Sequence, residues 1–324
     1  MITIQKIIDY LSEHISDPVP KYILIKEIYI KAPSSPEYVN AYNDMKQSKW
    51  YRELADEQWE DGSWGRFHTM SSKEIKQKFV STEAALVRAR GLGLSKDDPM
   101  IVKCIKIMER YVRGEETWTD YIEKHKDNGK SHIFCRPFMT AAQINMFDPE
   151  NSVIKPLRYV VAETLKTAFE NGDFDEDFWE QKVKQYHVPS IAHPRIAYSA
   201  MLLQNSNCMN DILQKQYLDS IWNGMNGIYY VSNISPADKQ HLEDKRFLPW
   251  FGTLELLSGF SLFPDFMRDD ALPHLLGETD RLINEDVDIS HIKTKASRYA
   301  ESWRDKNKHK TDVILRIARL LVKC

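Results

Sequence analysis

The chain has 324 residues, among them 12 glycines and 14 prolines, and this scarcity of turn residues excludes a turn-dense all-β sandwich or barrel. Its 44 basic and 47 acidic residues leave no bulk positive charge to hold a nucleic-acid backbone, so we expect no nucleic-acid partner. Hydrophobic residues make up 42%, enough for a sizeable core, yet no run approaches the roughly 18 consecutive apolar residues of a membrane span.

The N-terminal segment alternates apolar and charged residues, with Ile4, Ile7, Ile8 and Leu11 at helical spacing. This pattern predicts a surface helix and not a signal peptide, whose central run would be unbroken and apolar. The four cysteines are far apart, which is typical of reduced thiols. We therefore expect a cytoplasmic protein without a membrane span.

Two kinds of helix then alternate along the chain. Apolar residues fall on one face over 101–112 and 154–168, whereas 22–30, 191–203 and 250–260 are apolar on nearly all sides. Helices of the first kind lie at a surface, and helices of the second kind are enclosed by other helices. The sequence thus predicts outer and inner helices in turn.

This alternation has a fixed period. Glycines followed closely by an aromatic residue occur at Gly62, Gly114, Gly172 and Gly227, at intervals of 52, 58 and 55 residues, and each is expected to end an outer helix. The expected starts of the inner helices are Pro20, Thr82, Pro137, Pro194, Pro249 and Thr311. Six pairs account for residues 1–324 as a single domain. The prediction is an all-α fold, an (α/α)6 toroid of six inner and six outer helices; an open helical solenoid is the alternative with the same period.

Gln58, Gly62 and Trp64 form a Q-x-x-x-G-x-W motif. The motif resembles the repeat of terpenoid cyclases and the related prenyltransferase toroids, where the glutamine and tryptophan join a helix end to the following turn. Residues 20–100 are similar to uncharacterised bacterial prenyltransferase-like, or squalene-cyclase-like, proteins. The resemblance implies a toroid that binds an isoprenoid-type small molecule in an aromatic central cavity and cyclises it or eliminates a group from it.

The catalytic motifs of that superfamily do not carry over intact. The nearest match to the D-x-D-D motif of class II cyclases is Asp173-Phe174-Asp175-Glu176, in which the last aspartate is replaced. Asp173 and Asp175 are the candidate acids, although acidic residues are also favoured at a helix N-terminus. No D-x-C, Cys-His or D-D-x-x-D motif is present, and His132 with Cys135 supplies only two metal ligands. We therefore expect no metal and no cofactor.

The long connections of the toroid would meet at the mouth where the inner helices begin. Helix N-termini attract anions, and the local residues are basic. We expect a ligand with a phosphate, diphosphate or carboxylate group, held by Arg136 and Arg195, with Arg66 nearby in the 65–68 loop. The alternative is that these arginines are solvated or pair with Glu83 and Asp175.

Histidines and aromatic residues complete the predicted site. His68 and His193, with His187, are candidate general acids or bases, and the alternative for each is a structural, hydrogen-bonded imidazole. Aromatic residues in or beside the connections are expected to line the cavity: Trp64, Phe67, Trp118, Phe174, Tyr229, Tyr230 and Trp250. Such a lining suits an isoprenoid and a sugar ring equally well. The alternative is that these side chains fill the centre of the toroid and leave no cavity.

Three functions follow. The first is a toroid that binds an anionic isoprenoid-type molecule, with Asp175 or a histidine at the mouth moving a proton. The second is a carbohydrate-active (α/α)6 enzyme with paired carboxylates such as Glu83 and Asp175. The third is a non-catalytic toroid that binds a ligand or a protein.

Overall fold

The computed structural model describes residues 2–68, 77–117, 135–186, 190–224, 226–294 and 297–324. Within these residues the protein is all-α, as predicted, and β pairing is limited to two isolated bridges, Ile196 with Tyr229 and Ile228 with Ser232. None of the helices in the described part of the chain has the length and apolar character needed to cross a bilayer.

Most of the chain is in α-helices, with a π-helical turn η1 that continues α2 and a 3-10 turn η5 before α11. The elements are α1 (Ile4–His14), α2 (Pro18–Ile23), η1 (Leu24–Ile28), α3 (Pro36–Lys46), α4 (Lys49–Glu57), α5 (Thr82–Gly91), α6 (Pro99–Arg113), α8 (Cys135–Asn145), α9 (Lys155–Ala168), α10 (Glu176–Tyr186), η5 (Ser190–Ala192), α11 (Ala197–Leu203), α12 (Asp211–Trp222), α13 (Phe247–Leu257), α14 (Phe263–Arg268), α15 (Ala271–Asn284) and α16 (Lys306–Leu321).

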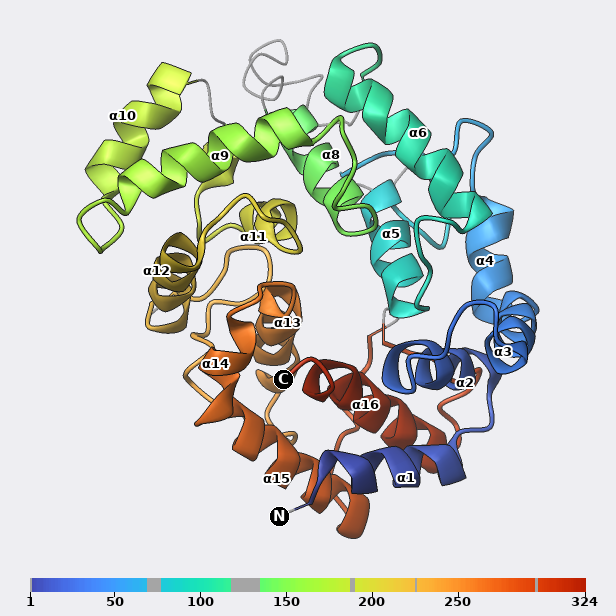
Figure 1. Cartoon of the computed structure of the whole chain (residues 1–324). Helices are drawn as coiled ribbons and strands as arrows, with labels where there is room; N and C mark the ends of the chain where they lie inside the picture. The colour runs from blue at the N-terminus through green and yellow to red at the C-terminus, as the bar shows by residue number, and fades with distance from the viewer. Residues whose placement is uncertain (1, 69–76, 118–134, 187–189, 225, 295–296) are drawn as a thin grey trace.

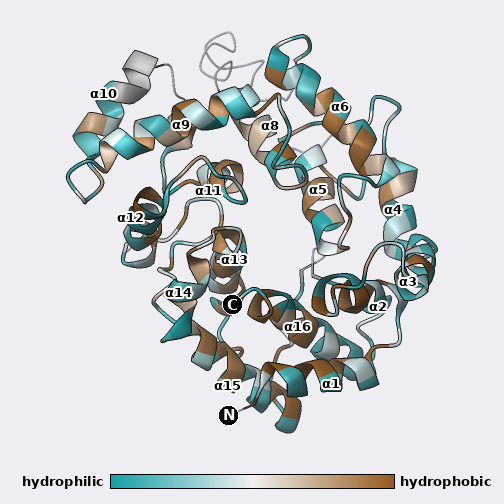
Figure 2. Cartoon of the chain, in the orientation of Figure 1, coloured by the Kyte–Doolittle hydropathy of each residue, from teal (hydrophilic) through white to brown (hydrophobic). Residues whose placement is uncertain are grey.

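The helices are arranged around a centre (Figure 1). Nearest to it are α2, α5, α8, α11, α13 and α16, while α4, α6, α9, α12, α14, α15 and α1 lie farther out. Helix α8 packs against both α6 and α11, and α16 packs against α1 and α15. The inner α13 is hydrophobic over much of its surface, whereas hydrophilic and hydrophobic residues alternate along the outer α9 (Figure 2). The predicted alternation of enclosed and one-faced helices is therefore present.

Most connections between the helices alternate between short and long segments, in the order that the predicted pairs of inner and outer helices imply. The segments that lead from an inner helix to the next outer one hold 5 to 9 residues, as between Gly91 and Pro99. Four of the returning segments, 58–81, 114–134, 223–246 and 285–305, hold 21 to 24 residues. The other two differ, because only residues 15–17 separate α1 from α2, and 169–196 contains α10 and η5. Long loops on a helical scaffold are where binding residues concentrate.

The predicted helix starts are correct to within a few residues, with one clear error. Thr82 is the first residue of α5, and Pro20, Pro137 and Pro249 each occupy the third position of a helix. Thr311, expected to cap the last helix, lies inside α16. The cap is Asp305, whose carboxylate accepts the backbone N–H of Asn307, so α16 begins a turn and a half earlier.

The glycine prediction holds best for Gly114. It is the C-cap of α6 and adopts a left-handed conformation with φ of 72°. Gly62, Gly172 and Gly227 also have positive φ, but each lies four or five residues beyond the end of its helix. They form the turns that follow the helices and do not cap them.

The Q-x-x-x-G-x-W motif joins a helix end to the following turn, as expected. The Gln58 side chain donates to the carbonyl oxygens of Gly62 and Met100, at 2.9 and 2.8 Å. Trp64 is fully buried, and its Nε1 donates to the Leu54 carbonyl at 2.9 Å. The end of α4, the turn and the start of α6 are thereby held together.

The first and last helical segments of the chain also meet. Helix α1 packs on α16, and the Lys308 ammonium lies 2.7 Å from the Asp17 carboxylate. Trp50 Nε1 donates to the carbonyl of Ala300 at 3.1 Å. Residues more than 200 positions apart in sequence thus form one seam of the structure.

Candidate functional site

A cavity of about 490 Å³ lies between the inner helices. Side chains from η1, α5, α8, α11, α13 and α16 line it, together with residues 230 and 231 of the long connection before α13. Its charged lining consists of four cationic side chains and three carboxylates: Arg90, Arg316, Arg319 and Lys323, with Glu27, Glu83 and Glu255. The cavity therefore combines hydrogen-bonding capacity with a small positive excess.

A hydrogen-bonded cluster is centred on Glu83, which lines the cavity together with Gln143 and Tyr198. Its Oε2 is 2.6 Å from His68 Nδ1, and its Oε1 accepts the hydroxyl of Tyr198 at 2.8 Å and Nε2 of Gln143 at 3.0 Å. Tyr198 OH is also 3.2 Å from His68 Nδ1. Carboxylate, phenol and imidazole are thus within proton-transfer distance of one another.

Local folding explains why these groups meet. Glu83 is in the first turn of α5, where the helix dipole favours a carboxylate. The backbone N–H groups of Thr82 and Glu83 donate to the carbonyls of Arg66 and Phe67, at 2.7 and 3.1 Å. This pairing fixes the 65–68 loop against the start of α5 and brings the next residue, His68, alongside Glu83.

The environment decides which of these groups carries a proton. Burial, reinforced by the charge and hydrogen bond of Glu83, raises the pKa of Tyr198 far above its usual range, so its hydroxyl stays protonated and donates. A carboxylate at Nδ1 selects the neutral imidazole tautomer in which Nε2 is the basic nitrogen. The cluster therefore offers a proton donor, Tyr198, beside a base, His68, that Glu83 orients.

Arg90 extends the cluster toward the C-terminal end of α5. Its Nη1 donates to Gln143 Oε1 at 2.9 Å, and burial lowers its pKa to about 10, which still leaves it charged at neutral pH. Arg316 pairs with Glu255 and Arg319 with Glu27, but Arg90 forms no carboxylate ion pair among the described residues. Among the described residues, Arg90 is thus the cavity arginine held by an amide, Gln143, while the nearby charge of Glu83 favours its protonated form.

Among the predicted site residues, His68 belongs to the cluster through its contact with Glu83, although it is not one of the residues that line the cavity. Tyr229 is 64% exposed and lies outside the cavity lining, and its ring centroid is 4.2 Å from that of Tyr230, which does line the cavity. The other predicted aromatic lining is packed elsewhere. Trp64, Phe67 and Trp250 are fully buried, and Trp250 Nε1 donates to the Pro236 carbonyl.

Asp173, Asp175 and His193 are away from the cavity lining. Asp173 is exposed, and Asp175 Oδ1 accepts the backbone N–H of Phe178 at the start of α10, the helix-capping role already noted as the alternative. His193 Nε2 is 3.0 Å from Glu176, and its ring packs edge-on against Phe174. His132, His187 and Trp118 lie outside the described residues.

The predicted anion-binding arginines are not part of the cavity lining either. Arg66, Arg136 and Arg195 are half-buried, and Arg195 lies against Gly224. The arginines that do line it come from the C-terminal halves of α5 and α16. The sequence could have indicated these residues. Arg90, Arg316 and Arg319 interrupt helices that are otherwise apolar, and a charged side chain in a largely buried helix needs a specific partner.

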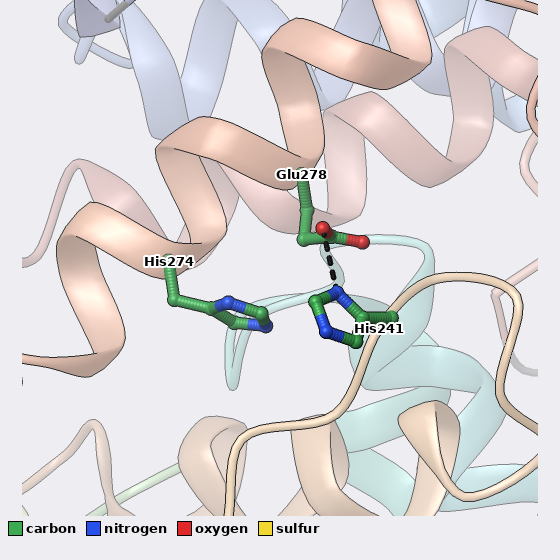
Figure 3. Close-up of side chains that lie close together, drawn as sticks. All are labelled: His241, His274 and Glu278. Atoms are coloured by element: carbon green, nitrogen blue, oxygen red, sulfur yellow. Dashed lines mark hydrogen bonds and ion pairs between the residues drawn. The ribbon is translucent and has the colours of Figure 1, made fainter.

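A second group of polar side chains lies apart from the cavity. His274 and Glu278 project from α15, and His241 comes from the connection before α13 (Figure 3). Among the described residues this is the set whose atoms are close enough together to hold a metal ion.

Comparison of the chain with protein-family models, with curated proteins and with solved structures finds no match.

Proposed function

We propose that the protein is an (α/α)6 toroid of the terpenoid cyclase and prenyltransferase type. In this proposal it binds a small anionic molecule in its central cavity and removes a proton from a carbon atom of that molecule. The observation that carries the functional part is that Glu83 and Tyr198, which line the cavity, contact each other and His68 beside them. Gln143 links Arg90 to the same hydrogen-bonded group. The Gln58 and Trp64 contacts, the alternating connections and the seam between the chain's ends support the architecture.

The proposed reaction is an elimination. Arg90 binds the anionic group, for which a planar guanidinium is well suited. His68 takes a proton from carbon, the electrons form a double bond, and the bond to the leaving oxygen breaks as that oxygen takes the electron pair and accepts a hydrogen bond from Tyr198. Glu83 stabilises the imidazolium that forms and keeps His68 and Tyr198 in position.

Two substrate classes fit an anion of this kind. An isoprenoid diphosphate is the class that the family resemblance implies. A sugar acid is favoured by the cavity itself, because seven charged side chains and Gln143 line it and hydroxyl groups would satisfy them. In that second candidate, Glu83 keeps the carboxylate role expected for it, while Asp175 lies outside the lining.

A cytoplasmic location is part of the proposal. The four cysteines, Cys104, Cys135, Cys208 and Cys324, carry reduced thiols, which is the usual state in a reducing compartment.

The test is binding and turnover with two probes, farnesyl diphosphate and an oligosaccharide of uronic acids. Calorimetry should detect binding of one of them, lost in Arg90→Met and retained in Arg268→Met, which removes an exposed arginine that pairs with Asp265. Absorbance of the new conjugated double bond reports elimination from the uronic acid, and release of diphosphate reports it from the isoprenoid. Absence of binding to both probes, or equal binding by Arg90→Met, would reject the proposal.

A further inference from the structure

The second polar group has the composition of a metal site. His274 and Glu278 are four residues apart on α15 and so share one face of the helix. His241 approaches from the 223–246 connection, with Nδ1 3.0 Å from Glu278 Oε1 (Figure 3). One ligand atom from each residue lies within 4.8 Å of the others.

The hydrogen bond of His274 fixes its tautomer. Its Nε2 is 2.9 Å from the carbonyl oxygen of Gln240, and because a carbonyl only accepts, Nε2 carries the proton. The lone pair of the neutral ring is therefore on Nδ1. Metal-binding histidines characteristically donate their other N–H to a carbonyl or carboxylate in this way.

Glu278 is a buried, ionised carboxylate. It is 4% exposed, and its Oε2 accepts the backbone N–H of Leu242 at 2.8 Å while Arg281 lies 2.9 Å from Oε1. Arg281 also pairs with Glu243 and Glu285, so acidic groups outnumber the one cation and favour a metal ion.

We propose that His241, His274 and Glu278 bind one divalent transition-metal ion, with zinc the best match. Two imidazoles and a carboxylate are a ligand set for zinc, whereas magnesium and calcium prefer oxygen ligands. In a tetrahedral site with bonds of about 2.1 Å, ligand atoms lie about 3.4 Å apart, so a small approach of His241 completes the site. His241 is the mobile partner because its side chain is 68% exposed, and water takes the fourth position.

The ion has a structural role that does not depend on the proposed reaction. His241 belongs to the same connection as Tyr230 and Val231, which line the cavity, while the other two ligands belong to α15. Zinc therefore fastens this cavity-lining connection to an outer helix.

The experiment is calorimetric titration of the full chain, freed of metal with a chelator, with zinc chloride alone. We expect one ion per chain, and at least a tenfold loss of affinity in His241→Ala and in His274→Ala. His291→Ala is the matched control. His291 also forms a hydrogen bond to the 223–246 connection, at the carbonyl oxygen of Asp244, but it is not one of the three proposed ligands. It should bind zinc as the unmodified chain does.

Cobalt(II) provides a second readout, because the absorption spectrum of the bound ion distinguishes tetrahedral from octahedral coordination. The exposed position of His241 means that its removal leaves the packing of the chain intact, so the His241 variant remains informative even where His274→Ala disturbs the loop. Zinc binding of equal strength in the unmodified chain and in His241→Ala would overturn the proposal, and so would the absence of one-to-one binding.

Discussion

Arg319 and Glu27 form a two-bond ion pair across 292 residues of sequence, with Nε to Oε2 at 2.7 Å and Nη2 to Oε1 at 2.8 Å. Arg319 Nη1 also donates to the carbonyl of Gly91 at 2.9 Å. A single guanidinium thereby connects the last helix, α16, to η1 and to the end of α5.

Removing this guanidinium should destabilise the protein strongly. Arg319→Met leaves the Glu27 carboxylate without its partner in a mostly buried position, so we expect the free energy of unfolding to fall by about 3 kcal/mol or more. Urea denaturation measures the change. Arg268→Met, at an exposed pair on α14, should cost less than about 0.5 kcal/mol. A loss as small as that of the control would show that the pair does not secure the seam.

Two glycines with positive φ should differ in their tolerance of alanine. Gly114→Ala places a Cβ in open space and should cost about 1 kcal/mol, the penalty of the left-handed conformation. In Gly62→Ala the Cβ would lie 2.6 Å from the Lys103 carbonyl oxygen, so its cost should be larger by at least about 1 kcal/mol. Thermal denaturation of the two variants side by side gives the comparison, and equal midpoints would contradict it.

Asp312 should make stability depend on pH in the direction opposite to that of most carboxylates. Burial raises its pKa from 3.8 to about 6, although the N–H groups of Ala300, Trp303 and Tyr299 oppose the shift. The folded state therefore holds this proton more tightly than the unfolded chain, and the contribution of Asp312 to stability is full below pH 4 and lost as pH rises through 6.

The measurement is the difference in unfolding free energy between the unmodified chain and Asp312→Asn, followed from pH 4 to pH 7. Over that range the unmodified chain should lose on the order of 3 kcal/mol relative to the variant, because two pKa units correspond to about that energy. A difference that stays constant with pH would exclude a raised pKa at Asp312.

Tyr198→Phe should separate binding from chemistry. The variant keeps the ring and Arg90 but removes the hydroxyl that donates to Glu83, so we expect turnover to fall at least 100-fold with little change in substrate affinity. Steady-state kinetics with the substrate found in the binding test measures both quantities. Tyr159→Phe, on an exposed residue, is the control. Full turnover in Tyr198→Phe would remove Tyr198 from the mechanism.

The helices were predictable because their signals are local. Apolar periodicity identified α1, α6 and α9. Thr82, Pro20, Pro137 and Pro249 lie in the first turns of their helices, whereas Pro194 precedes α11 by three residues. Thr311 was a wrong prediction because a threonine before an apolar run resembles a cap, whereas α16 already includes the charged turn from Lys306 to Lys310. Asp305, one residue before that turn, was the cap.

The site was harder to predict because its members come together only through the tertiary fold. Glu83, Gln143 and Tyr198 are more than 50 residues apart from one another in the sequence, so no sequence motif with a fixed spacing contains them. The prediction placed the cations at the starts of the inner helices, whereas Arg90 and Arg319 lie near helix ends. His68 was found because it follows a recognisable motif, and its carboxylate partner was named only as a member of an alternative pair.

The seam described above bears on the order in which the chain folds during synthesis. Glu27 and Asp17 leave the ribosome early. Their ion-pair partners, Arg319 and Lys308, are synthesised near the end of the chain. The first helices can form on emergence, yet the carboxylates of Asp17 and Glu27 lack their ion-pair partners until almost the whole chain has been made. Contacts between residues so distant in sequence form slowly. We therefore expect the nascent N-terminal third to be sensitive to proteases until α16 is released and docks.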